Sequence, residues 1–171
     1  MLVTHLSESF NNKIKSIVVR NLKPKNLTRL VTKMPMKFNQ LIIEKTLNYL
    51  FSEQIIENEF EFLNGRILQI TIEDANLIMG ISAKKSKLCC TYLGTDHFIA
   101  DAYLSIDTSN AILLANQKTD PDTLFFQRKL KIKGDTELVH HTKNIIDSLA
   151  PDIIPNNLLK LLAYYKEQVL H

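Results

Sequence analysis

Several short runs in the middle of the chain alternate between hydrophobic and polar residues. Apolar side chains occupy every second position in residues 68–72, 102–106 and 129–133. A period of two residues is typical of a strand with one buried face. Lysine fills the alternate positions of the third run, which predicts a strand with a cationic outer face. Apolar runs over 77–83 and 88–93 predict two further strands, separated by a solvated turn at 84–87.

Glycines mark interruptions in this strand region. Asn64-Gly65 is a strong hairpin signal, because both residues tolerate the positive φ angles of tight two-residue turns. Gly80 interrupts the run over 77–83 and predicts a bulge in that strand.

Apolar residues recur at helical spacing on both sides of the strand region. A long helix is predicted over about 38–57, with Ile43, Leu47, Leu50 and Phe51 on its buried stripe. Phe38, Ile42 and Tyr49 widen that stripe, so we expect both sides of the helix to be covered. Further helices are predicted over about 12–22, 108–116 and 156–170. Thr108 or Ser109 is the predicted cap of the second of these. Two more helices are predicted to start after the capping residues Asp120 and Asp135.

The order of these elements predicts an α+β fold with a mainly antiparallel, five-stranded sheet covered by helices. The chain has 171 residues, of which 45% are hydrophobic, which is enough for one packed core. We expect a basic amphipathic extension over 1–37, a folded domain over 38–150 and an amphipathic C-terminal helix over 151–171.

Charge is divided unevenly along the chain. Residues 1–43 hold eight basic residues and one acidic residue, a net charge of +7, whereas residues 44–171 hold thirteen basic and seventeen acidic residues, a net charge of −4. Such a basic end suggests contact with an anionic surface. The residues predicted to touch a membrane are Lys13, Ile14, Ile17, Val18 and Arg20, together with the face from Leu158 to Val169.

Membrane contact of this kind amounts to reversible adsorption and not to anchoring. A merely solvated basic extension is the alternative. Nucleic acid is the weaker partner, because Phe10 and Phe38 are the only aromatic residues before Tyr49 to stack on bases.

The sequence also indicates where the protein works. No apolar run approaches the length that spans a bilayer, and Lys13, Lys15 and Arg20 interrupt every candidate signal peptide. Adjacent Cys89 and Cys90 form no disulfide framework, which favours a reducing compartment. We therefore expect a cytoplasmic protein that associates reversibly with membranes.

The chain offers no convincing catalytic constellation. Asp120 and Asp122 could act as paired carboxylates, but acids at a helix start are favoured by the helix dipole. Glu137 and His141 lie one turn apart, as metal ligands can, yet a third ligand is missing. We predict a non-enzymatic protein without cofactor or metal, and an enzyme that uses these four residues remains the alternative.

One long motif points to a known family. The run from Asp120 to Arg128, which contains Phe125-Phe126, is followed by Gly134-Asp135-Thr136-Glu137-Leu138 and by Lys143-Asn144. With the segments 59–66 and 100–107, it resembles the UbiT-like ubiquinone biosynthesis accessory factors, which have a sterol-carrier-type lipid-binding domain. The resemblance covers roughly residues 38–149.

The resemblance implies a sterol-carrier-like fold with an apolar tunnel for a long isoprenoid or acyl chain, phospholipid included. It implies a carrier that presents ubiquinone precursors to hydroxylases working without oxygen and that associates with other ubiquinone-synthesis proteins. The residues expected to line the tunnel are Leu104, Ile106, Leu124, Phe125, Phe126, Leu130 and Ile145. The alternative is a scaffold with a filled core that only bridges enzymes or docks them at the membrane.

Overall fold

The computed structural model describes residues 23–148 and 156–169 of the chain. The helix predicted over 12–22, with the five residues assigned there to membrane contact, lies outside this range. The helices are α2 (Pro24–Lys33), α3 (Met36–Leu50), α4 (Ser52–Ile56), the 3-10 helix η1 (Glu61–Leu63), α5 (Thr108–Ala115), α6 (Pro121–Phe126), α7 (Thr136–Ser148) and α8 (Asn156–Val169). The strands are β1 (Leu68–Ile72), β2 (Leu77–Ala83), β3 (Leu88–Gly94), β4 (Ala102–Ile106) and β5 (Leu130–Gly134).

The five strands form one sheet in the order β3-β2-β1-β4-β5. Neighbouring strands are antiparallel except β1 and β4, which run parallel. The predicted α+β class and the mainly antiparallel five-stranded sheet are therefore confirmed. A register shift between Gly80 and Ile81 in the β2–β3 pair matches the predicted bulge.

The core lies where one face of the sheet meets the helices. Leu68 of β1 pairs with Ile81 and with Ala102, so the three central strands present apolar side chains in register. Buried residues from α6 and α7 complete the hydrophobic cluster: Leu124, Leu138, Val139 and Ile145. Burying each such leucine or isoleucine contributes roughly 1.5–3 kcal/mol, so this layer is the main stabilising feature.

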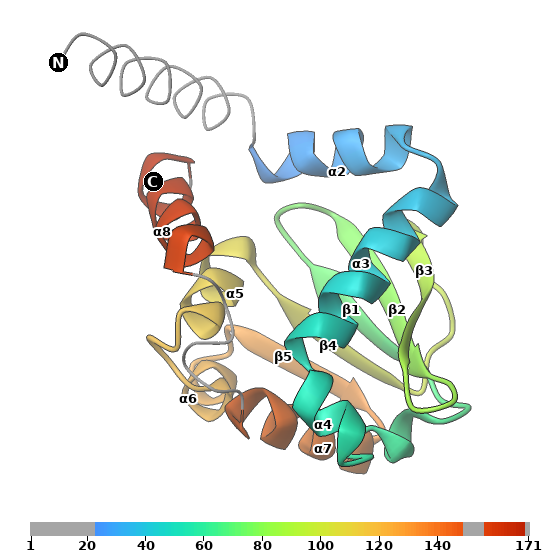
Figure 1. The fold of residues 1–171 in the computed structure, drawn as a ribbon. Helices are drawn as coiled ribbons and strands as arrows, with labels where there is room; N and C mark the ends of the chain where they lie inside the picture. The colour runs from blue at the N-terminus through green and yellow to red at the C-terminus, as the bar shows by residue number, and fades with distance from the viewer. Residues whose placement is uncertain (1–22, 149–155, 170–171) are drawn as a thin grey trace, which may run out of the picture.

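The helices are distributed along the sheet. Figure 1 shows α3 in front of the sheet, where it contacts the edge strand β3. Helix α6 contacts β5, α7 contacts β4 and β5, and α8 lies beside α5. The second face of the sheet is covered in part by the loop after β3, where Phe98 packs on Tyr92 with ring centroids 4.8 Å apart.

The helix predicted over 38–57 is two helices, because the chain leaves α3 at Phe51 and resumes in α4. Ile43, Leu47 and Phe51 pack against the core as expected. The prediction that both sides of this helix are covered is wrong. Phe38, Ile42 and Tyr49 are 50%, 47% and 67% exposed.

Two local predictions at turns and caps are also wrong. Asn64-Gly65 does not join two strands but follows η1, and Gly65 supplies a φ of +71° before β1 begins. The cap of α5 is Asp107, whose carboxylate accepts from the Asn110 N–H at 2.7 Å. Aspartate one position earlier outcompetes the Thr108 hydroxyl because it places a charged acceptor at the helix start.

Candidate functional site

The motif that begins at Asp120 forms a short helix fixed at its start. The Asp120 carboxylate accepts from both the backbone N–H and the hydroxyl of Thr123, each at 2.7 Å, and Pro121 is the first helical residue. The Thr123 hydrogen bonds hold the pKa of Asp120 below its ordinary value. The second aspartate, Asp122, pairs with Lys143 of α7. Asp120 therefore caps the helix, as predicted, whereas Asp122 forms an ion pair that the sequence analysis did not predict.

The same helix is closed at its other end. The Lys129 N–H donates to the Leu124 carbonyl at 2.9 Å, and Arg128 takes a left-handed φ of 60°. This is a Schellman-type ending. Between the two ends, Leu124 is only 1% exposed, whereas Phe125 and Phe126 are 44% and 80% exposed with ring centroids 5.8 Å apart. The helix thus anchors itself through Leu124 and presents both rings at the surface.

The seven residues predicted to line a tunnel separate into two groups. Five of them lie together in the buried hydrophobic cluster: Leu104, Ile106, Leu124, Leu130 and Ile145. They come from β4, α6, β5 and α7, so distant parts of the chain meet in one interior layer. Phe125 and Phe126 lie outside that layer, at the surface. Whether this layer receives a ligand stays a prediction.

A pocket opens beside the hydrophobic cluster near α4 and η1. It has a volume of about 310 Å³ and is lined by Ile55, Asn58, Phe60, Glu61, Asn64, Ala83 and Ser86. Phe60 and Ala83 belong to the core, and Phe60 meets Phe51 edge to face with ring centroids 5.4 Å apart. This volume is at the lower end of the range for ligand pockets. Sequence reasoning missed Ile55 and Phe60 as lining residues, although apolar residues alternating with glutamates over 59–63 were a signal.

A second pocket lies on the opposite face of the sheet. It has a volume of about 470 Å³ and is lined by Gln69, Glu73, His97, Tyr103, Ser105, Lys131, Lys133 and Gly134. Lys131 donates to both oxygens of Glu73, at 2.8 and 2.9 Å, so its charge is already balanced. The pocket beside α4 and η1, in contrast, adjoins the hydrophobic cluster, so the helix-covered face is the candidate apolar site.

The residues considered for catalysis or metal binding are not assembled into a centre. In the described part of the chain, no three His, Cys, Asp or Glu side chains are grouped so that they could hold a metal ion. His141 stacks on Phe62, with ring centroids 5.1 Å apart, which is a packing role. Burial raises the pKa of the Cys90 thiol to about 11, so this cysteine is no activated nucleophile.

Within residues 23–148 and 156–169, no helix is both long enough and apolar enough to cross a bilayer.

Comparisons with known proteins agree with the fold. UbiT, the ubiquinone biosynthesis accessory factor of Escherichia coli (strain K12), is 35% identical over 151 residues, which span 88% of this chain and 84% of UbiT. The UbiT proteins of strains O6:H1 and O157:H7 give the same values. A solved structure of UbiJ-SCP2, a ubiquinone synthesis protein, aligns with a TM-score of 0.53 and 19% identity over 71% of this chain and 98% of UbiJ-SCP2.

A model of the SCP-2 sterol transfer family matches residues 45–147, which is more than half of the chain and includes the sheet with most of its covering helices. The resemblance stated from the sequence is therefore confirmed. The chain belongs to the SCP-2 sterol transfer family and is a UbiT-like member of it.

Proposed function

We propose that this protein is a non-enzymatic, lipid-binding accessory factor of ubiquinone biosynthesis. The observation that carries the proposal is the 35% identity to UbiT over 88% of the chain, on a fold of the SCP-2 sterol transfer family. The site agrees with carriage and not with catalysis, since its polar side chains are used in caps and ion pairs.

The proposed ligand is an isoprenoid ubiquinone precursor or another lipid with a long hydrocarbon tail. A polyprenyl tail costs about 0.8 kcal/mol for each CH₂ equivalent left in water, so it needs cover outside the bilayer. The interior layer of Leu104, Ile106, Leu124, Leu130 and Ile145 would contact the tail. Phe125 and Phe126 would flank the mouth of the site, because they follow Leu124 directly and lie at the surface.

Uptake of a long tail would require the helices to move away from the sheet. The interior residues proposed to contact the tail are at most 6% exposed, and the adjoining pocket of about 310 Å³ is too small for a whole polyprenyl chain. Lipid binding would therefore select a more open conformation, in which side chains exchange contacts with one another for contacts with the tail.

The proposed partners follow from this role. The carrier would present precursors to other ubiquinone-biosynthesis proteins, including hydroxylases that work without oxygen. It would collect them from an anionic membrane surface, to which the basic residues of segment 1–43 are suited.

Lipid extraction tests the proposal. The full chain is purified, extracted with organic solvent and examined by mass spectrometry, and a delipidated sample is then offered vesicles that contain a prenylated precursor. We expect a prenyl or acyl lipid in the first extract and uptake in the second. Absence of both would refute the carrier function.

A scaffold without ligand is the second candidate, and the filled interior favours it. Five of the seven predicted contact residues already pack on one another. Lipid uptake by the unchanged protein separates the two functions. The Phe125→Ala variant then tests the proposed mouth of the site, because Phe125 is 44% exposed and its loss should cost little stability. A carrier should lose lipid uptake while its partners are retained, whereas a scaffold should show no uptake before or after the change.

A further inference from the structure

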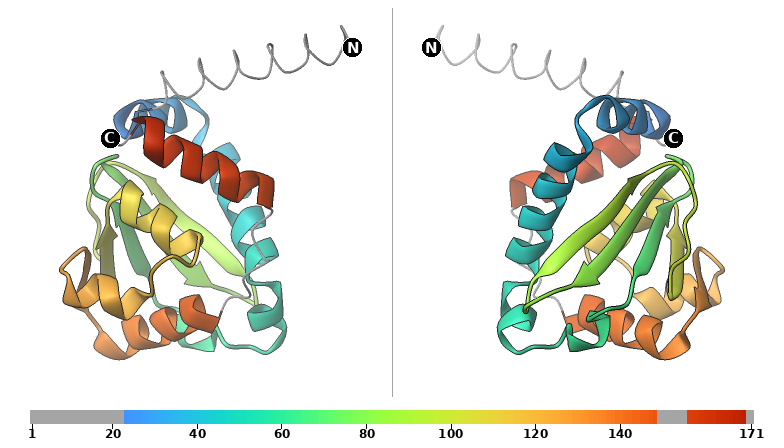
Figure 2. Two further views of the ribbon diagram at one scale, coloured as in Figure 1. Left: turned by 90° about the vertical axis from the view of Figure 1, so that its left-hand side faces the viewer. Right: turned by 90° about the vertical axis from the view of Figure 1, so that its right-hand side faces the viewer.

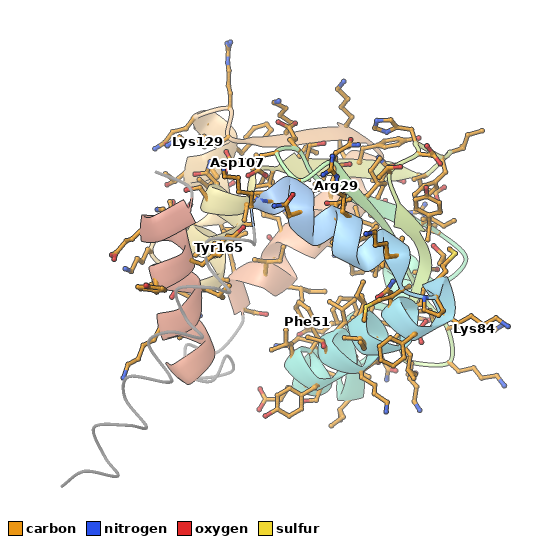
Figure 3. The ribbon with its side chains drawn as sticks, turned by 90° about the horizontal axis from the view of Figure 1, so that it is seen from above. Arg29, Phe51, Lys84, Asp107, Lys129 and Tyr165 are labelled. Atoms are coloured by element: carbon orange, nitrogen blue, oxygen red, sulfur yellow. The ribbon has the colours of Figure 1, made fainter. Side chains whose placement is uncertain are left out.

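The face of the sheet opposite the hydrophobic cluster carries a pocket that the proposed function does not use. Its lining comes from β1, β4 and β5, with Glu73 after β1 and His97 from the loop after β3, and none of these residues belongs to a helix. Side chains alternate between the two faces of a strand, so they point away from the interior layer. Figure 2 shows α3 along one side of the molecule, with strands and loops along much of the opposite side. Figure 3 shows Lys129, which begins the run of alternate lysines, on the far side of the molecule from Phe51.

Two rows of side chains cross the sheet at this pocket. Gln69 of β1 is in register with Tyr103 of β4, and Tyr103 is in register with Lys133 of β5. The second row lies two residues away along each strand and consists of Thr71, Ser105 and Lys131. Neighbouring strands are about 4.8 Å apart, so the first row extends over about 10 Å from the backbone of Gln69 to that of Lys133.

The loop after β3 forms one wall of the pocket. Phe98 packs over Gly80, where a Cβ would lie 2.8 Å from the Phe98 ring. The Ala100 N–H donates to the Tyr103 hydroxyl at 3.0 Å. These two contacts hold the loop against the sheet and keep the neighbouring His97 at the pocket that it lines.

One buried group in this pocket lacks a partner. Gln69 is only 2% exposed, and its Oε1 accepts no hydrogen bond from the described residues. Its Nε2 donates to the Thr71 hydroxyl at 3.2 Å and lies 3.4 Å from Nδ1 of His97. With the amide turned the other way, its NH₂ group would be the end without a partner. A buried amide end that stays unpaired is costly, so this arrangement indicates that a ligand binds next to Gln69.

The space beside Gln69 is larger than a single water molecule needs. A water molecule takes about 30 Å³ of liquid volume. The pocket has a volume of about 470 Å³, which lies within the range of small-molecule sites.

The charge at the other end of the first row is positive. Lys131 is paired with Glu73, whereas Lys133 forms no ion pair with any of the described residues. The Tyr103 hydroxyl accepts from a backbone N–H and keeps its own hydrogen for donation. A carboxylate with a single negative charge matches one unbalanced lysine with a hydroxyl donor beside it.

We propose that this pocket binds a small monocarboxylic acid that carries a hydroxyl group at its far end. The carboxylate would lie at Lys133 and Tyr103, and the hydroxyl group at Gln69. A hydroxyl group suits either orientation of the Gln69 amide, because it can donate to Oε1 or accept from the NH₂ group. The site goes beyond the carrier function and does not rest on it, since it lies across the sheet from the interior layer.

Titration of the full chain, followed through the NMR chemical shifts of its backbone amides, tests this site. The probes are 6-hydroxyhexanoate, hexanoate, which lacks the hydroxyl group, and 1,6-hexanediol, which lacks the carboxylate. We expect 6-hydroxyhexanoate to shift the amides of β1, β4 and β5 around Gln69 and Lys133. It should bind at least about fivefold more tightly than either other probe, because it alone makes both polar contacts.

Two variants each remove one of the proposed contacts. Lys133→Gln should weaken the binding of 6-hydroxyhexanoate about fivefold at low salt, and the difference should shrink as salt is raised. Gln69→Leu should bind 6-hydroxyhexanoate no more tightly than hexanoate, because the amide that recognises the hydroxyl group is gone.

Matched controls carry the same chemical changes elsewhere. Lys129 is exposed and lies outside the pocket lining. Gln54 is 6% exposed, and its Oε1 also has no partner among the described residues, but it lines neither pocket. Lys129→Gln and Gln54→Leu should bind 6-hydroxyhexanoate as the unchanged protein does. Urea unfolding of every variant shows whether a loss of binding is a loss of folding, and Lys133→Gln, at an exposed position, keeps the test decisive if Gln69→Leu does not fold.

Four results would overturn the site. The first is an absence of amide shifts up to the solubility limit of 6-hydroxyhexanoate. The second is a set of shifts remote from Gln69 and Lys133, which would assign binding to another place such as the pocket beside α4. The third is equal binding of hexanoate and 6-hydroxyhexanoate by the unchanged protein, which would leave the Gln69 amide without a role. The fourth is tighter binding of inorganic phosphate at the same amides, which would assign the pocket to another class of anion.

Discussion

Asn48 offers the sharpest test of how α3 is held to the sheet. Its amide bridges both backbone groups of Leu88, a residue that is only 3% exposed. Asn48→Ala removes the two hydrogen bonds to Leu88, at about 1 kcal/mol each, and a third to the Glu44 carbonyl within the helix. The backbone groups of Leu88 then depend on water for a partner. Alanine is the better helix former by up to about 0.7 kcal/mol, which offsets part of the loss. We expect a net destabilisation of roughly 1–2 kcal/mol.

Urea unfolding measures this free energy, and thermal unfolding checks it, since 1 kcal/mol corresponds to about 2–4 °C in a domain of this size. The control is Thr46→Ala on the same helix. Thr46 is exposed and its hydroxyl reaches only the Ile42 carbonyl, at 2.9 Å. This variant should be neutral or slightly stabilised. If Asn48→Ala were as stable as the Thr46→Ala control, the side chains of Gln40, Glu44 and Asn48 would not hold α3 to the sheet. The exposure of the apolar side chains of α3 would then lack this explanation.

The remaining predictions concern the core, the backbone and one thiol. Leu124→Ala should lower the free energy of unfolding in urea by about 2–5 kcal/mol, because Leu124 is 1% exposed. Phe126→Ala should lower it by less than about 1 kcal/mol, because its ring is 80% exposed. Equal losses would contradict the described packing. Gly65→Ala should lower the free energy of unfolding by about 1 kcal/mol, because its φ is +71°. Gly134→Ala should lower it clearly more, since its φ is +90° and a Cβ would lie 2.5 Å from the Asp101 carbonyl oxygen. Equal stability of the two variants would contradict this explanation. Cys90 should resist iodoacetamide in the folded protein and react in urea. Because burial raises the pKa of this thiol from 9.0 to about 11, the contribution of the protonated thiol to stability should be lost as the pH rises through that window. Alkylation of Cys90 in the folded protein at the unfolded rate would contradict its burial.

Much of the sheet could be predicted because its signal is local. In residues 68–72 and 102–106 each apolar side chain belongs to the same buried face, so a period of two identifies the strand without knowledge of its neighbours. The caps of α6 and α7 were equally local, since Asp120 and Asp135 bond to N–H groups within three residues.

The predictions were wrong or incomplete where contacts between residues distant in the sequence determine which side chains are buried. The sequence analysis assigned no contacts to Gln40, Glu44 and Asn48, whereas these side chains bond to the unpaired edge of β3. Apolar residues of α3 therefore face outward. No pattern within α3 reveals that its neighbour is an edge strand. Five of the seven predicted ligand contacts do meet in one cluster, because buried strands and helices converge on one core. The exposure of Phe125 and Phe126 depends on Leu124 being the anchoring residue of α6.

Native mass spectrometry of the purified full chain tests the central claim of lipid carriage most directly. After exposure to vesicles that contain a prenylated quinone precursor, the protein should carry a mass above its 19.6 kDa polypeptide, and organic solvent should release one lipid that accounts for the difference. A bare polypeptide under the same conditions, with urea stability unchanged by the vesicles, would contradict the account, because a bound ligand must stabilise the folded state.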